Sequence, residues 1–278
     1  MTKDENCEWG FLGPSGSFSE EALRKVMTNN DCKCIPFDSI LTLLNAFRNG
    51  EVEKVILPIE NSIEGIVIPA IDKIINGDID FVIEREIELL IIQNLIGRGE
   101  LQNAKIVVSH PQALAQCTKF IEMYQLITKQ SDSTSAGVEL VSKNKNKKDL
   151  MAIGSRLAAE IYNLEIIREG IQDSKENSTR FIVLGHNSQQ ITRADKTSLI
   201  FEIENKSGAL LRVLEIFDAL DINMTNIISR PSKAGSGKYI FWVDIEGHQL
   251  RETVSVALKQ IRKRTNILKI LGSYPKAK

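Results

Sequence analysis

Histidine and cysteine are scarce in this chain, and neither occurs in a metal-binding pattern. The 278 residues include three histidines and four cysteines. The histidines are widely spaced, and no two cysteines have the Cys-x-x-Cys spacing of a zinc site or a thioredoxin-like redox motif. We therefore expect no metal site. Because disulfides are rare in the cytosol, we expect reduced thiols at all four positions, Cys7, Cys32, Cys34 and Cys117.

Long apolar runs and a large net charge are also absent. The longest apolar runs are far too short to span a bilayer, and the residues after Met1 lack the apolar core of a signal peptide. A formal net charge of −1 gives no field that would attract nucleic acid or an anionic membrane. We expect a cytoplasmic protein with neither kind of partner. The length allows two domains with cores of their own.

The first 185 residues alternate between short apolar runs and helix-start signals. Strands are expected near residues 9–12, 54–59, 104–108, 126–127 and 150–153, each followed by a polar segment rich in Ser, Thr or Asn that suits a helix N-cap. This alternation predicts parallel sheets with helices on both faces. Ligands bind beyond the carboxyl ends of such strands, where helix N-termini favour anions. For any one of these residues taken singly, capping a helix is a sufficient explanation, without a role in ligand binding.

One stretch combines groups that suit an anionic substrate with a ring. Residues 177–181, Asn-Ser-Thr-Arg-Phe, lie between a polar run and the apolar run 181–184, which predicts a loop entering a buried strand. Thr179, Arg180 and Phe181 place a hydroxyl, a guanidinium and an aromatic ring at consecutive positions. The alternative is a loop whose Thr and Arg only satisfy the backbone.

Together with four other segments, this stretch resembles the prephenate dehydratase family. In order, the segments are GPSGSFS at 13–19, PIENSIEG at 58–65, SHPQALAQC at 109–117, STSA at 133–136 and NSTRF at 177–181. The family usually has Thr where this chain has Ser17, which keeps the hydroxyl. The resemblance implies a bilobal, periplasmic-binding-protein-like catalytic domain over residues 7–185, with an α/β fold. Lobe one is expected at 7–85 and 169–185, and lobe two at 86–168.

After a polar linker at 186–195, residues 196–274 are expected to form a second domain. Strands near 197–203, 224–229, 239–245 and 267–271, helices at 209–220 and 251–264, and a hairpin turn at 235–237 give the ferredoxin-like order βαββαβ. The segment resembles an ACT domain in two motifs, Gly208-Ala209-Leu210 and Ser229-Arg230-Pro231. The resemblance implies phenylalanine binding at the interface of a homodimer or homotetramer. Ile228 stands where related dehydratases usually carry Glu, and a module that only dimerises is the alternative.

The activity that the resemblance implies is the conversion of prephenate to phenylpyruvate, water and CO₂, inhibited by phenylalanine and requiring no cofactor or metal. Thr179 is then the essential residue, which donates to or orients the leaving hydroxyl, and His110 is the rival proton donor. The expected substrate-binding residues are Ser17, Glu60, Asn61, Ser62, Ser109, His110, Gln112, Ser133, Thr134, Arg180 and Phe181. The eight residues before Trp9 leave no room for a preceding chorismate mutase domain, so we expect a monofunctional enzyme.

Two other functions fit the same residues. An arogenate dehydratase would act on a substrate with an amino group in place of the side-chain keto group. A non-catalytic sensor would join a bilobal binding domain to an amino-acid-binding module, although the intact Thr179 and the intact segment 60–62 argue against it.

Overall fold

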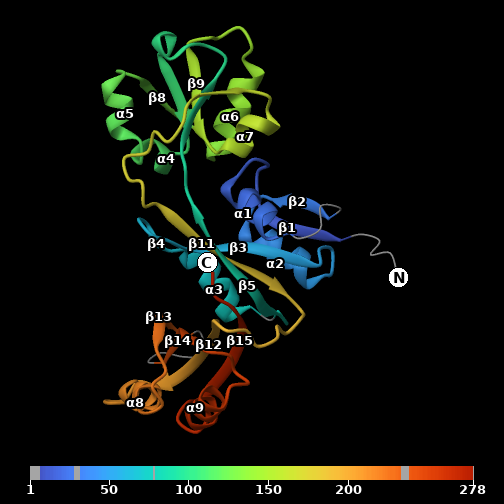
Figure 1. The fold of residues 1–278 in the computed structure, drawn as a ribbon, viewed down its shortest axis with the longest axis vertical. Helices are drawn as coiled ribbons and strands as arrows, with labels where there is room; N and C mark the ends of the chain where they lie inside the picture. Colours follow the sequence, from blue (N-terminus) through green and yellow to red (C-terminus); the bar gives the residue numbers. More distant parts are fainter. Residues whose placement is uncertain (1–6, 28–31, 78, 233–237, 278) are drawn as a thin grey trace. The chain divides into compact units, whose positions relative to one another are not determined.

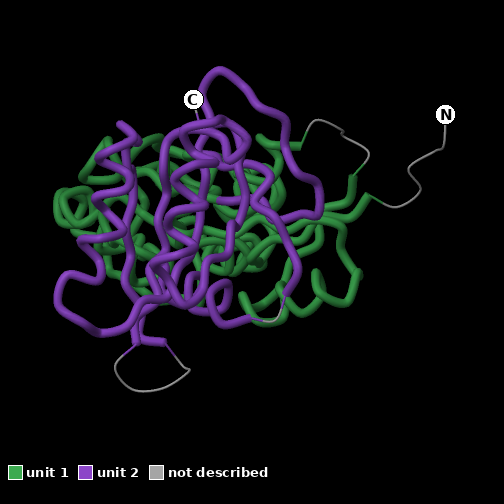
Figure 2. Tube along the Cα trace, turned by 90° about the horizontal axis from the view of Figure 1, so that it is seen from below, with its two compact units in different colours: residues 1–66, 88–181 green, residues 67–87, 182–278 purple. Residues whose placement is uncertain are grey.

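The computed structural model describes residues 7–27, 32–77, 79–232 and 238–277, whose strands form three sheets (Figure 1). The chain divides into two compact units. One is formed by residues 1–66 and 88–181, and the other by residues 67–87 and 182–278 (Figure 2).

The first sheet begins with parallel strands joined by helices, as expected. Its strands, in order, are β2 (Lys33–Phe37), β1 (Glu8–Leu12), β3 (Lys54–Asn61), β11 (Ser178–Gly185) and β5 (Val82–Leu90), with β4 (Gly65–Ile66) paired to β3. β1 runs parallel to β2 and β3, and α1 (Phe18–Val26) and α2 (Ile40–Arg48) make the crossovers. The prediction missed β2, β4, β5 and α2. β2 is short, half-exposed and contains Pro36, so it lacks a buried-strand pattern.

The second sheet corrects the expectation of wholly parallel sheets. Its order is β10 (Glu165–Arg168), β6 (Asn94–Gly97), β9 (Leu150–Gly154), β7 (Ile106–Ser109) and β8 (Ile127–Gln130). β7 is parallel to β8 and β9, but β6 is antiparallel to β9 and β10. Only residues 91–93 separate β6 from β5. The chain therefore enters the second sheet directly from β5, without the crossover helix that a parallel connection needs, and β6 runs opposite to its two neighbours.

Serine hydroxyls cap most of the longer helices of these two sheets. Ser17, Ser39, Ser133 and Ser155 each accept a backbone N–H at the start of α1, α2, α6 (Thr134–Lys143) and α7 (Arg156–Ile161). The remaining helices of this part are α3 (Ile68–Asn76), η1 (Leu101–Asn103), α4 (Pro111–Ala115) and α5 (Thr118–Met123).

Cys7 and Cys32 form a disulfide, so the expectation of four reduced thiols is wrong for this pair. β1 and β2 pair in parallel, with Glu8 opposite Lys33. This register places the two preceding residues side by side, with Cα atoms 4.6 Å apart, within the range that a disulfide bridges. The register of two paired strands cannot be read from the spacing of cysteines, so the sequence did not predict this disulfide. Cys34 and Cys117 remain free thiols.

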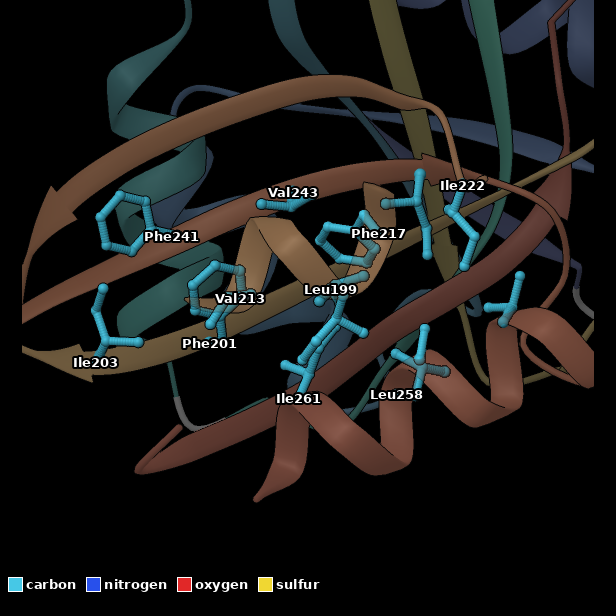
Figure 3. Close-up of a cluster of buried hydrophobic side chains, with 14 residues drawn as sticks. Leu199, Phe201, Ile203, Val213, Phe217, Ile222, Phe241, Val243, Leu258 and Ile261 are labelled. Atoms are coloured by element: carbon cyan, nitrogen blue, oxygen red, sulfur yellow. The ribbon is translucent and has the colours of Figure 1, made fainter. Parts of the chain in front are cut away.

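The third sheet confirms the βαββαβ order of the second domain. Its order is β13 (Met224–Pro231), β14 (Lys238–Glu246), β12 (Asp195–Glu204) and β15 (Ile267–Pro275), all antiparallel. α8 (Leu211–Ala219) and α9 (Glu252–Arg262) pack against β12 and β14 around a cluster that includes Leu199, Val213 and Ile261, each fully buried (Figure 3). The rings of Phe201 and Phe241 stack in this core, 5.4 Å apart. The hairpin turn expected at 235–237 lies outside the described residues.

Candidate active site

Thr179 and Asn61 meet where the end of β3 lies beside the start of β11. Both side chains are about nine-tenths buried. The Thr179 Oγ1 atom accepts a hydrogen bond from Asn61 Nδ2 at 2.9 Å. The Asn61 amide cannot turn over, because its Oδ1 atom accepts the backbone N–H groups of Ile63 and Glu64. Asn61 therefore turns its NH₂ group toward Thr179 Oγ1, the Ser178 carbonyl and Asn177 Oδ1.

The hydrogen of the Thr179 hydroxyl is left available to a ligand. Thr179 Oγ1 acts as acceptor toward Asn61, and within the described residues no protein acceptor is found for its own hydrogen. A hydroxyl that accepts one hydrogen bond polarises its own O–H bond and becomes a better donor. This arrangement suits a group on a substrate that needs a hydrogen-bond donor.

Ser62 ties the two segments of the site together. Its hydroxyl donates to the Glu176 carbonyl at 3.1 Å and accepts the backbone N–H of Ser178 at 2.9 Å. Its own backbone N–H donates to the Ser178 carbonyl. Ser62 thus holds residues 176–178 against the end of β3, which sets the position of Thr179.

Asn177 extends the network to a residue that the sequence analysis did not single out. Its Oδ1 accepts from Asn61 Nδ2 at 2.8 Å, and its Nδ2 donates to Gln116 Oε1 at 3.1 Å. Gln116 belongs to the family motif at 109–117, but the sequence pattern gave no reason to choose this side chain from the motif. Asn177 and Gln116 line a pocket of about 300 Å³, whose other lining residues are Ile63, Glu64, Ala115, Gln172, Asp173 and Ser174.

Three helix starts converge beside the turn at residues 13–17. The Ser155 hydroxyl, at the start of α7, donates to the Gly16 carbonyl at 2.6 Å, and the Ser135 hydroxyl, in the first turn of α6, bonds to the Ser15 carbonyl. Gly16 has a φ of 82°, and a Cβ there would lie 2.8 Å from Ala158 Cα. Only glycine permits this approach. The expected gathering of capped helix ends is therefore present in this part of the fold.

Several of the expected substrate-binding hydroxyls serve the protein backbone. Ser17 Oγ donates to the Leu12 carbonyl and accepts the Glu20 N–H. Ser133 Oγ accepts the Ala136 N–H, and Thr134 is the first residue of α6. Ser109 is fully buried, and its hydroxyl donates to the Ile153 carbonyl.

The remaining expected residues differ in exposure. His110 is the N-cap of α4, and its Nδ1 accepts the Gln112 N–H at 3.3 Å, so only Nε2 can carry a hydrogen toward a ligand in this arrangement. The Gln112 side chain is exposed. Glu60 and Arg180 are half-buried. Phe181 is buried in the sheet, with 2% of its surface exposed.

The two motifs of the second domain differ in their surroundings. Gly208 has a φ of 75°, and Ala209 and Leu210 lead into α8. Ser229 and Pro231 are exposed on β13. Arg230, in contrast, donates two hydrogen bonds to the Asp72 carboxylate in α3.

Among the described residues, no group of three or more His, Cys, Asp or Glu side chains is placed to hold a metal ion. No helix in the same residues is long and apolar enough to cross a membrane.

Comparison with known proteins identifies the family. Residues 9–189 match the family model of prephenate dehydratase, and residues 197–263 match that of the ACT domain. The chain is 39% identical over 267 residues to the prephenate dehydratase of Methanocaldococcus jannaschii, covering 94% of this chain and 96% of that protein. It is 32% identical over 278 residues to arogenate dehydratase/prephenate dehydratase 2 of Arabidopsis thaliana, covering 95% of this chain and 72% of that protein.

A solved structure agrees with the sequence comparisons. The prephenate dehydratase of Arthrobacter aurescens, solved in complex with L-Phe, superposes with a TM-score of 0.88 at 31% identity and covers 97% of this chain and 90% of that one. The chain thus belongs to the prephenate dehydratase family and carries an ACT domain after its catalytic domain.

Proposed function

We propose that this protein converts prephenate to phenylpyruvate, with loss of water and CO₂, and that Thr179 acts on the leaving hydroxyl. The observation that carries the proposal is the Thr179–Asn61 hydrogen bond. It holds the threonine as an acceptor toward the protein and leaves its hydrogen for the substrate. Family membership supplies the substrate class.

The chemistry is a fragmentation driven by aromatisation. Prephenate is a cyclohexadienol with two carboxylates. The bond between the ring and its carboxylate breaks to release CO₂, and its electron pair moves into the ring. The bond from C4 to the hydroxyl breaks, and hydroxide leaves with one added proton as water. A hydrogen bond from Thr179 stabilises the negative charge that develops on the departing oxygen, and positioned proton donation typically contributes about 10²–10⁴-fold.

The two carboxylates of prephenate call for anion binding. We assign this task to the helix starts around Ser17, Ser133 and Thr134, together with Asn61 and Ser62. Helix N-termini favour anions even without cationic side chains. The remaining proposed substrate-binding residues, taken from the family motifs, are Glu60, Ser109, His110, Gln112, Arg180 and Phe181.

We assign the catalytic domain to residues 7–185, with lobe one at 7–85 and 169–185 and lobe two at 86–168. Residues 186–195 form the linker, and residues 196–274 form the regulatory ACT domain. Phenylalanine binds at Gly208, Ala209, Leu210, Ser229, Arg230 and Pro231 and inhibits the enzyme. The protein acts in the cytoplasm as a homodimer or homotetramer joined at least partly through the ACT domain, whose exposed sheet edge favours pairing.

A paired assay tests the activity. The purified protein is incubated with prephenate and, separately, with arogenate, and phenylpyruvate and phenylalanine are measured. We expect phenylpyruvate from prephenate without added metal. Product from arogenate alone would instead identify an arogenate dehydratase, an activity that the name of the Arabidopsis relative includes. If neither product forms, the remaining hypothesis is the non-catalytic amino-acid sensor.

The regulatory assignment has its own measurement. Phenylalanine is titrated while activity and melting temperature are followed, and light scattering reports the size of the particle. Inhibition with a rise in melting temperature is expected. No response of either quantity up to millimolar phenylalanine would mean that Ile228 marks a lost effector site, and that the ACT domain serves dimerisation only.

A further inference from the structure

The amide side chains next to Thr179 form a chain of hydrogen bonds with a single direction. Asn61 sets that direction, because backbone N–H groups hold its oxygen. Asn61 Nδ2 therefore donates to Asn177 Oδ1, and Asn177 Nδ2 in turn donates to Gln116 Oε1. Gln93 Nε2 lies 3.4 Å from the same Gln116 oxygen and also donates to it.

Gln93 is buried, with 3% of its surface exposed, and its own Oε1 has no hydrogen-bond partner within the described residues. Turning its amide over would place that oxygen against Gln116 Oε1, which is also an acceptor. A buried acceptor without a partner costs free energy. In this orientation the Gln93 oxygen lacks a partner, while the Gln93 NH₂ group stabilises the orientation of the Gln116 amide.

The same residue also orients a second glutamine. The backbone N–H of Gln93 donates to Gln172 Oε1 at 3.0 Å. Gln116 and Gln172 both line the pocket of about 300 Å³. Since the oxygen of each amide is held by the protein, the NH₂ groups remain for a ligand. Neither NH₂ group has a protein acceptor in the described part of the chain.

We propose that Gln116 and Gln172 select the 2-oxo acid side chain of the substrate over a 2-amino acid side chain. The inference rests on the proposed function and names its specificity. Amide NH₂ groups donate to a keto oxygen or a carboxylate, but they oppose an ammonium group, which can only donate. The pocket is near enough for this role, because Asn177, which lines it, shares the Asn61 amide with Thr179.

Two carboxylates also line this pocket and would favour an ammonium group. Glu64 and Asp173 are both exposed, and the Asp173 oxygens accept the backbone N–H of Lys119. Exposed charges are screened by water and salt. The oriented amides therefore decide the preference, and the carboxylates lie at the edge of the pocket.

Substitution of each glutamine by glutamate, which replaces the amide nitrogen by an oxygen, tests the proposal. In Gln116→Glu and Gln172→Glu, one carboxylate oxygen can keep the hydrogen bond from the protein while the other faces the ligand as an acceptor. For both variants we expect the ratio of kcat/KM for prephenate to kcat/KM for arogenate to fall by about tenfold to a hundredfold. The loss on prephenate should lie mainly in KM, because the contact is made in the ground state as well as in the transition state.

Gln260→Glu provides the matched control. It makes the same change on an exposed position of α9 in the ACT domain and should leave the ratio unchanged. An unchanged ratio in both pocket variants, in an active and folded protein, would overturn the inference while leaving the proposed function intact. A larger shift in Glu64→Gln or Asp173→Asn than in the pocket variants would also overturn it, by assigning the selection to the carboxylates. Failure of the wild-type protein to act on prephenate would instead refute the proposed function.

Discussion

Arg230 of β13 binds Asp72 of α3 with two parallel hydrogen bonds, Nε to Oδ1 at 2.7 Å and Nη2 to Oδ2 at 2.8 Å. Both residues belong to the unit formed by residues 67–87 and 182–278. Arg230 is the central residue of one proposed phenylalanine-binding motif, whereas α3 follows the β3–β4 segment that contains Asn61. A bidentate pair fixes orientation as well as distance.

The first prediction follows from this pair. Asp72→Ala should keep catalytic activity but raise the phenylalanine concentration for half-maximal inhibition by about fivefold or more, within the usual range of allosteric coupling. The physical reason is that Arg230 loses the contact that fixes it to α3. The control is Asp218→Ala, an exposed aspartate on α8 in the same domain. Equal inhibition curves for Asp72→Ala and wild type would show that the pair does not transmit the effector signal.

The second prediction concerns the hydroxyl of Thr179. Thr179→Ala should lower kcat by about 10²–10⁴-fold with little change in substrate binding, since a donor to the leaving group acts mainly in the transition state. Thr179→Ser should retain more activity, because the hydroxyl survives. Steady-state kinetics on prephenate measures both. Near-normal kcat in Thr179→Ala, combined with a loss in His110→Gln, would move the proton donor to His110.

Asn61→Asp should reduce kcat without unfolding the site. The introduced carboxylate can still accept the N–H groups of Ile63 and Glu64, but it has no N–H to donate. The Thr179 hydroxyl would then donate to this carboxylate and turn its hydrogen away from the substrate. We expect kcat to fall by about tenfold or more. The melting temperature should fall as well, because the buried carboxylate would face the Asn177 Oδ1 and Ser178 carbonyl oxygens that the amide NH₂ group served, so kcat is measured below the melting temperature of the variant. Asn103→Asp, on the exposed η1 segment, is the control, and equal kcat in the two variants would contradict the orienting role of Asn61.

The Cys7–Cys32 disulfide determines how many cysteine thiols can react with a thiol reagent. Denatured, unreduced protein should react with a thiol reagent at two cysteines, Cys34 and Cys117, and at four after reduction of the Cys7–Cys32 bond. The bond closes a loop with a sequence separation of 25, so its loss should lower stability by about 3.5 kcal/mol on the chain-entropy model. Four reactive thiols before reduction, in protein purified without reductant, would disprove the bond.

Cys117 should be nearly inert in the native protein. Burial raises the pKa of its thiol to about 12, and the nearby Asp173 charge adds to the rise. At pH 8, about one molecule in ten thousand carries the reactive thiolate. Cys34 is only half-buried, although burial also raises the pKa of its thiol. Mass spectrometry after brief alkylation at pH 8 should find Cys34 labelled before Cys117, and the reverse order would contradict this account.

The chain itself determined the class of fold and the reaction family. Alternating apolar runs and serine caps predicted the strand–helix units around Ser17, Ser133 and Ser155, because period and capping are local properties of consecutive residues. The βαββαβ order of the second domain was predicted for the same reason. Thr179 stood out because its neighbours in the chain formed a recognisable segment.

Tertiary structure decided the contacts between distant segments. The Asn61–Thr179 bond joins residues 118 positions apart, the Arg230–Asp72 pair joins residues 158 apart, and the disulfide depends on the register of two parallel strands. The strand directions in the second sheet and the roles of Gln93, Gln116 and Gln172 belong to the same group. A glutamine has the same local pattern on any surface, and only the packed neighbours that hold its oxygen determine which way its NH₂ group points.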